Sequence, residues 1–188
     1  VAGDVDVNRL KAELTRGFAP WKARPAKKTP VYREPKPAGL SIRLVDKPDQ
    51  TQSQIVVASL GVAHGDKDYL ATVLMNHTLG GDTFDSRLGK SIRVQGGKTY
   101  GVDSGVERWR TRGELVIETA TRTAETLATL KLILGEVDKL KSGGPTAAEL
   151  AAAKANIAGG YASRFETAGD VAIALLGAEL HRLGENYV

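Results

Sequence analysis

The chain has 188 residues, 41% of them apolar, which is enough for one domain with a hydrophobic core. It contains no cysteine, which excludes disulfides, thiolate catalysis and cysteine-ligated metals. No run of about 18 apolar residues occurs, so no membrane span is predicted. The N-terminal residues lack the basic start and apolar stretch of a signal peptide.

The net charge of +4 leaves a nucleic-acid-binding protein open as a minor hypothesis. Acidic residues alternate with the basic ones, as at Glu107-Arg108, and only 5% of the residues are aromatic. A base-stacking platform is therefore hard to build, and a solvated, mildly basic surface explains the charge better.

The N-terminal part falls into two segments. Residues 4–18 are predicted to be helical, because apolar residues recur every three or four positions and Asp4 or Asp6 can cap the start. Five prolines then punctuate residues 20–40, which are interpreted as a linker. Residues 1–19 are expected to be the terminal helix of a preceding domain.

From residue 41 to residue 188 the pattern predicts a second domain. Its expected strands cover residues 40–45, 53–62, 99–106 and 114–121. Two helices are expected at residues 66–79 and 84–92, and a long third helix ends at Ser142-Gly143-Gly144-Pro145. A fourth helix runs from a Thr146/Glu149 capping box to about Phe165, and Asp170 caps the last one. Since strands and helices do not alternate regularly, the fold class is predicted to be α+β. We expect a mostly antiparallel sheet with helices packed on one face.

The three histidines do not form a zinc motif. A zinc peptidase needs two histidines one helical turn apart, with a nearby glutamate that activates water. Neither H-x-x-E-H nor its reverse occurs around His64, His77 or His181. No metal site is predicted in this chain.

Residues 74–105 contain a series of motifs at a defined spacing. Gly80-Gly81 is followed by Phe84, by Ser86-Arg87-Leu88, and by Arg93 and Tyr100, which lie seven positions apart. This series, together with the T-x-x-E-L-x-x-A-K start of the helix at Thr146, resembles the inactive domain of the pitrilysin (M16) family of zinc peptidases, in particular of its bacterial two-subunit members.

The resemblance implies a role for this chain. In that family, one half carries H-x-x-E-H and zinc, and the other half has lost the zinc ligands. The second half supplies the arginine and the tyrosine, here Arg93 and Tyr100, for substrate binding, and the tyrosine also acts in catalysis. The expected partners are a zinc-bearing subunit and a peptide, and the expected cofactor is zinc in the partner, with none in this chain. Residues 41–188 would be a pitrilysin-type inactive domain, truncated at its C-terminus, in an assembly that is active only as a whole.

Alternative interpretations remain for these residues and for the chain. From the sequence alone, Arg93 suits a surface ion pair and Tyr100 suits a half-buried aromatic residue of a strand. The chain would then be a structural or assembly module of the same fold without a catalytic role. The resemblance to two-subunit members suggests a periplasmic location, with the cytoplasm as the alternative.

Overall fold

The chain divides into two compact units in a computed structural model that describes residues 1–25, 30, 39, 41–43, 45–109 and 111–184. The first unit is Val1–Pro48 and the second is Asp49–Val188. The predicted linker at residues 20–40 lies largely outside the described residues.

The first unit contains one helix, α1 (Val7–Phe18). Asp6 caps it, because its carboxylate accepts the N–H groups of Asn8 and Arg9 at 2.9 Å each. None of the helix residues is buried within the unit. The strand expected at residues 40–45 is not formed by residues 41–43, and residues 40 and 44 lie outside the described residues. An alternating pattern gives a stable strand only when a partner strand pairs with it, which explains why this prediction is wrong for residues 41–43.

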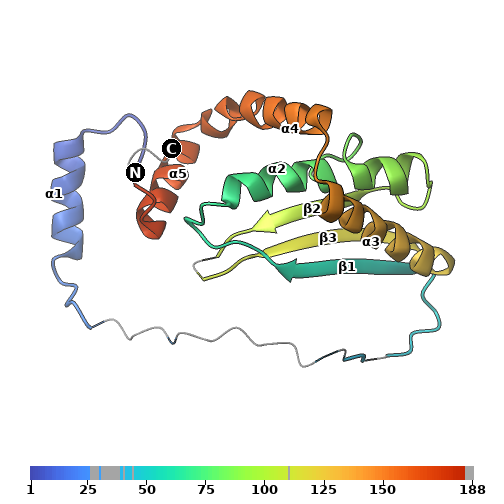
Figure 1. The fold of residues 1–188 in the computed structure, drawn as a ribbon. Coiled ribbons are helices and arrows are strands. Elements are labelled where there is room, and N and C mark those ends of the chain that lie inside the picture. Colours follow the sequence, from blue (N-terminus) through green and yellow to red (C-terminus); the bar gives the residue numbers. More distant parts are fainter. Residues whose placement is uncertain (26–29, 31–38, 40, 44, 110, 185–188) are drawn as a thin grey trace. The chain divides into compact units, whose positions relative to one another are not determined.

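The second unit is built on a three-stranded antiparallel sheet with the order β1-β3-β2 (Figure 1). The strands are β1 (Gln52–Leu60), β2 (Val102–Glu107) and β3 (Glu114–Arg122). Thr119 of the central strand pairs with Ile55 on one side and with Val102 on the other. The predicted α+β fold class is thereby confirmed.

Helices cover one face of this sheet, as predicted. Helices α2 (Tyr69–Leu79) and α3 (Thr126–Gly143) lie on the same side of the three strands (Figure 1). The side chains that pack between these helices and the sheet are almost fully buried, among them Val102, Ile117 and Ile133. Val56 points to the opposite face and is 59% exposed, because no described element of the second unit covers that face.

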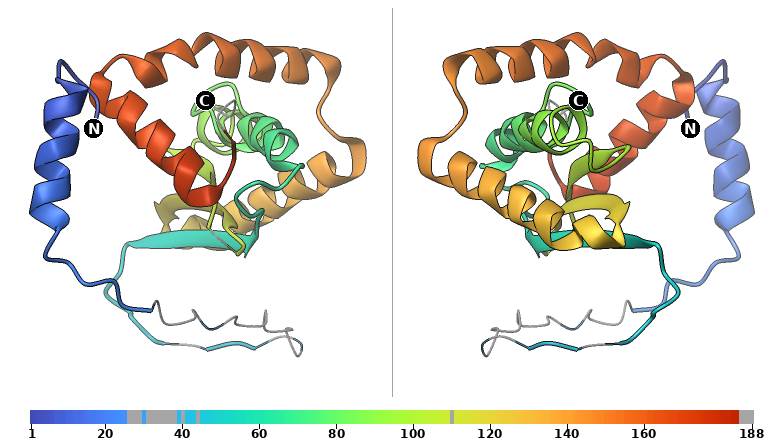
Figure 2. Two further views of the ribbon diagram at one scale, coloured as in Figure 1. Left: turned by 90° about the vertical axis from the view of Figure 1, so that its left-hand side faces the viewer. Right: turned by 90° about the vertical axis from the view of Figure 1, so that its right-hand side faces the viewer.

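Three further helical segments follow α3. They are α4 (Ala147–Gly159), the 3-10 helix η3 (Ala162–Phe165) and α5 (Ala168–His181). Helix α4 lies on the side of α2 that faces away from the sheet (Figure 2). Among the described residues, no helix has the length and apolar character needed to cross a membrane.

Several helix ends differ from the prediction, among them the start of α2, which lies at Tyr69 rather than Asp66. The alanine-rich helix stops at Gly159, before Phe165, because the Gly159-Gly160 pair disfavours continued helix. The cap of α5 is Thr167 rather than Asp170: the Thr167 hydroxyl accepts the N–H of Asp170, whose carboxylate accepts the N–H of Thr167 in return. The predicted Thr146/Glu149 capping box is confirmed.

Candidate functional site

The segment between α2 and β2 carries the predicted site residues, and it begins at a close contact. Helix α2 ends at Gly80, where the backbone passes against the side chains of Ser104 and Leu88. A Cβ atom at position 80 would lie 2.7 Å from the Ser104 hydroxyl oxygen and 2.9 Å from a Leu88 methyl carbon. A larger residue would force these two side chains to shift, so the first glycine of the motif lets the segment pack closely against the core.

A turn around Phe84 replaces the first part of the helix predicted over residues 84–92. The Asp82 carboxylate accepts the N–H groups of Phe84 at 2.9 Å and Asp85 at 2.7 Å. The N–H groups of Asp85 and Phe84 lower the pKa of Asp82, so this side chain is anionic and holds the turn. An aspartate that captures following N–H groups competes with helix formation, which explains why the helix starts later.

The helix that carries Arg93 spans residues 87–94, and its last part is the π-helix η1 (Gly89–Val94). Single-turn π-helices are frequent at functional sites. Leu88 and Ile92 are fully buried in the core, and they fix the helix to the sheet. The backbone position of Arg93, one residue after Ile92, is therefore well determined.

The guanidinium of Arg93 lies over the ring of Phe84. Its Cζ atom is 4.2 Å from the ring centroid, which is a cation–π contact. In the part of the chain that the structure describes, Arg93 forms no ion pair. The surface ion pair considered for Arg93 is therefore absent from the described residues.

Tyr100 lies in the loop between η1 and β2, and its side chain is 96% exposed. The predicted strand at residues 99–106 starts only at Val102, because the Thr99 hydroxyl bonds to the N–H and C=O groups of Gly101. Tyr100 is accordingly not a half-buried residue of a strand.

The backbone that follows Gly97 is bonded to β3 and to the start of α3. The Thr121 hydroxyl donates to the carbonyl of Lys98 at 2.8 Å, and the Lys98 ammonium pairs with Glu125. The Thr119 hydroxyl bonds to the Thr99 hydroxyl at 2.9 Å. These contacts fix residues 98 and 99, so the backbone directly before Tyr100 is held in place. No hydrogen bond or ring contact joins Tyr100 to Arg93 among the described residues.

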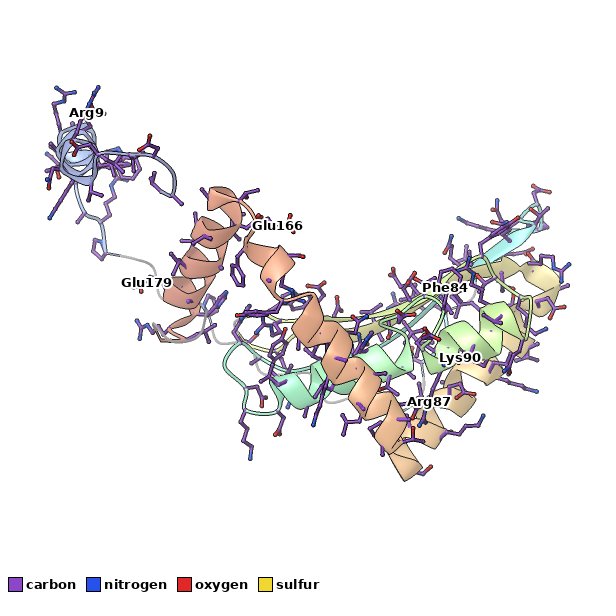
Figure 3. All side chains as sticks on the ribbon, turned by 90° about the horizontal axis from the view of Figure 1, so that it is seen from above. Arg9, Phe84, Arg87, Lys90, Glu166 and Glu179 are labelled. Carbon is purple, nitrogen blue, oxygen red and sulfur yellow. The ribbon has the colours of Figure 1, made fainter. Side chains whose placement is uncertain are left out.

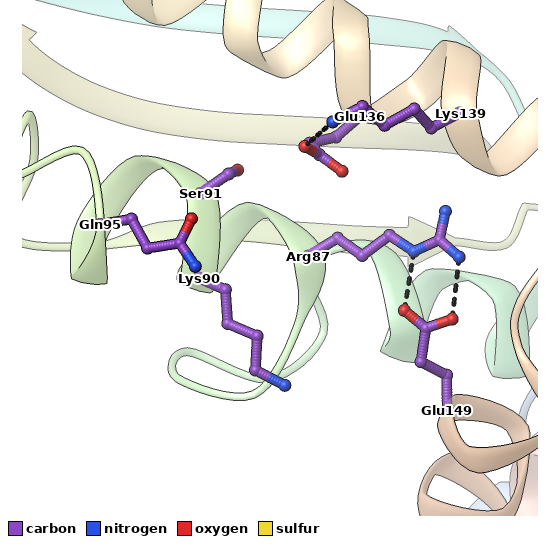
Figure 4. A pocket seen from close by; sticks show the side chains of 7 residues that line it. All are labelled: Arg87, Lys90, Ser91, Gln95, Glu136, Lys139 and Glu149. Carbon is purple, nitrogen blue, oxygen red and sulfur yellow. Dashed lines mark hydrogen bonds and ion pairs between the residues drawn. The ribbon is translucent and has the colours of Figure 1, made fainter.

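Arg87 forms the strongest polar contact of the segment, and sequence reasoning did not find its partner. Its Nε and a terminal nitrogen donate to the two carboxylate oxygens of Glu149 at 2.8 Å each (Figure 4). The terminal nitrogen also donates to the Gly144 carbonyl at 2.9 Å. The hydrogen bond from Arg87 is the main reason that the pKa of Glu149 is lowered to about 2. The pair lines a cavity of about 420 Å³ between η1, α3 and α4. The two residues lie 62 positions apart, so no local pattern could have paired them.

The three histidines lie in two different environments. His77 of α2 lines a cavity of about 240 Å³ together with Asn156 and Arg164. The rings of His64 and His181 are stacked, with centroids 3.4 Å apart and planes inclined by 10°. The described residues contain no cluster of three or more His, Asp or Glu side chains suited to a metal ion.

The family profile described as "Peptidase M16 inactive domain" matches residues 1–157. The chain belongs to the peptidase M16 inactive-domain family. The predicted family resemblance is thereby confirmed for the larger part of the chain, including the segment from Gly80 to Tyr100. No curated protein matches the chain.

Three solved structures illustrate the likeness to other M16 inactive domains and to proteases. A peptidase M16 inactive domain from Pseudomonas fluorescens is 33% identical, with a TM-score of 0.69 over 73% of this chain and 32% of that one. A protease from Helicobacter pylori is 23% identical, with a TM-score of 0.81 over 96% of this chain and 44% of that one. A putative zinc protease from Bordetella pertussis Tohama I is 20% identical, with a TM-score of 0.57 over 72% of this chain and 74% of that one. The last two show the fold alone, and the chain spans less than half of the first two.

Proposed function

We propose that this M16 inactive domain is the non-catalytic half of a zinc metallopeptidase. In this proposal it contributes Arg93 and Tyr100 to the active site of a partner subunit that carries H-x-x-E-H and zinc. The substrate is a peptide, and hydrolysis requires both subunits. Membership of the inactive-domain family supports the first part of the proposal.

The observation that carries the proposal is the exposure of Tyr100. Tyr100 is 96% exposed, and the two residues before it are bonded to β3. Its phenol is therefore available to a molecule outside this chain. A tyrosine buried under its own helices would instead favour the alternative of a structural module that has lost its chemistry.

The two side chains suit peptide hydrolysis. The reaction builds negative charge on the scissile carbonyl oxygen, and zinc in the partner would supply one electrophile. The phenol O–H of Tyr100 can donate a second stabilising hydrogen bond to that oxygen. The planar fork of Arg93 can bind a backbone carbonyl or a carboxylate of the peptide.

The proposal includes a periplasmic location, with the cytoplasm as the alternative. Its support is the resemblance to bacterial two-subunit peptidases. Cell fractionation with an antibody against the native protein would distinguish the two compartments.

Peptide hydrolysis by the full-length protein, alone and mixed with its zinc-bearing partner, tests the proposal. We expect activity only in the mixture, and we expect Tyr100→Phe to lower kcat on the order of 10²-fold, because one donor to the developing oxyanion is lost. Tyr161→Phe is a matched control, since Tyr161 is 45% exposed and lies outside the proposed site.

Two results would contradict the proposal. Full activity of the partner alone would leave no role for this chain in the chemistry. An unchanged kcat in the Tyr100→Phe mixture would make the chain a structural module.

A further inference from the structure

Among the described residues, the contact with Phe84 leaves the hydrogen-bond donors of Arg93 without an acceptor. A cation–π contact arises between the charge of the guanidinium and the ring, here at 4.2 Å from Cζ to the ring centroid, and it requires none of the five N–H groups to donate to an oxygen acceptor. Arg87, on the same helical segment, shows the opposite arrangement, because its donors are used by Glu149 and Gly144. The aromatic contact therefore holds Arg93 without consuming the groups that would bind a substrate.

The ring of Phe84 is itself fixed by the turn that carries it. The Asp82 carboxylate accepts two N–H groups of that turn, one of them from Phe84 at 2.9 Å. The turn also lies directly against the start of η1: a Cβ atom at Gly89 would lie 2.5 Å from the Thr83 carbonyl oxygen. Glycine at position 89 thus permits the close approach that brings the ring to the helix of Arg93.

The ring nevertheless lies at the surface. Phe84 is 59% exposed, so burial in the core does not explain its position. Lys90, on the helical segment that follows the turn, is also exposed, and Figure 3 labels both residues. A large exposed aromatic side chain whose ring lies under one cation is suited to positioning that cation.

We propose that Phe84 is a positioning residue for Arg93, holding its guanidinium so that the N–H donors point to the peptide bound by the assembly. This inference rests on the proposed function. It assigns to Phe84 a role in substrate binding through Arg93, and none in the chemical step. An arginine that binds the ground state and the transition state equally affects KM more than kcat.

The test is a double-mutant cycle in the full-length protein mixed with its zinc-bearing partner. Phe84→Leu keeps an apolar side chain and removes the aromatic face. We expect it to lower kcat/KM by about 3- to 10-fold, mainly through KM. Phe84→Trp, which keeps the aromatic face, is expected to retain kcat/KM. In an Arg93→Met background, Phe84→Leu is expected to have no further effect, because the guanidinium that it positions is gone.

Different outcomes separate this inference from the proposed function. If Arg93→Met lowers kcat/KM and Phe84→Leu does not, or if the two effects simply add, the positioning role is wrong and the proposed function stands. If Arg93→Met itself leaves kcat/KM unchanged, the proposed role of Arg93 fails, and the role of Phe84 fails with it.

A measurement without catalysis checks the contact directly. The ring of Phe84 should shift the Arg93 Nε–H proton resonance upfield in the native protein. Phe84→Leu should remove that shift, and an unchanged resonance would overturn the inference.

Discussion

Two arginines six positions apart show how their surroundings assign different roles to one residue type. The side chain of Arg87 is 15% exposed and forms a bidentate salt bridge with Glu149. It therefore joins the segment between α2 and β2 to the junction of α3 and α4. Arg93 has no such partner among the described residues and lies over the ring of Phe84. The first is structural, and the second keeps its donors available.

Replacing Arg87 by lysine should destabilise the protein. Lysine keeps the charge but lacks the planar fork, so the paired bonds to Glu149 and the bond to Gly144 cannot all form. We expect Arg87→Lys to lower the free energy of unfolding by about 1–2 kcal/mol in urea denaturation.

The exposed pair of Asp85 and Lys90, at 3.5 Å, supplies the matched control. Asp85→Asn should change the free energy of unfolding by less than about 0.5 kcal/mol. Equal effects of the two substitutions would show that the Arg87 bridge contributes no more than a surface pair.

At the scale of elements, the sequence predicted most of the second unit. β-branched runs and helical periodicity located β1, β3, α2 and α3, because these elements each bury one face against the core, and the capping box located the start of α4. The site segment was predicted less well. At Asp82 and at Thr99, a side chain forms hydrogen bonds with nearby backbone groups. Such bonds shift the ends of helices and strands without changing the pattern of apolar residues.

The candidate site was predictable only in part. The order of Gly80, Phe84, Arg93 and Tyr100 identified the segment, but the sequence did not reveal that Phe84 faces Arg93. The Arg87–Glu149 bridge joins positions far apart in the chain, and only the packing of α4 over α2 brings them together.

The stacked pair of His64, in the loop after β1, and His181, at the end of α5, should make the free energy of unfolding depend on pH. Burial lowers the pKa of His64, and the neighbouring His181 and Arg108 lower it further. The unfolded chain then binds a proton at His64 more readily than the folded chain does. Neutral His64 therefore contributes fully to the free energy of unfolding above its ordinary pKa of about 6.5. This contribution is lost as the pH falls from about 6.5 through the lowered pKa of the folded state.

Urea denaturation at pH 7.5 and pH 5.5 measures this effect. The native protein should lose free energy of unfolding between the two conditions, and His64→Phe, which keeps a flat ring against His181, should lose less. The same loss in both proteins would mean that His64 does not cause it.

At the scale of the whole molecule, the chain spans 32% of the Pseudomonas fluorescens structure and 44% of the Helicobacter pylori structure that it matches. Its second unit offers an exposed tyrosine and an oriented arginine, while its described residues hold no cluster of potential metal ligands. The proposed function assigns the zinc ligands to a second chain. The central claim is therefore one of position: Tyr100 should lie beside a peptide held by the zinc-bearing partner.

Photo-crosslinking tests that position most directly. A photoreactive phenylalanine analogue is introduced in place of Tyr100 in the full-length protein, which is then mixed with the zinc-bearing partner and a labelled peptide that resists hydrolysis. We predict that the label becomes attached to this chain only when the partner is present, and that the same analogue in place of Tyr161 captures no label. Capture of label without the partner, or capture at position 161 and not at position 100, would contradict the shared site.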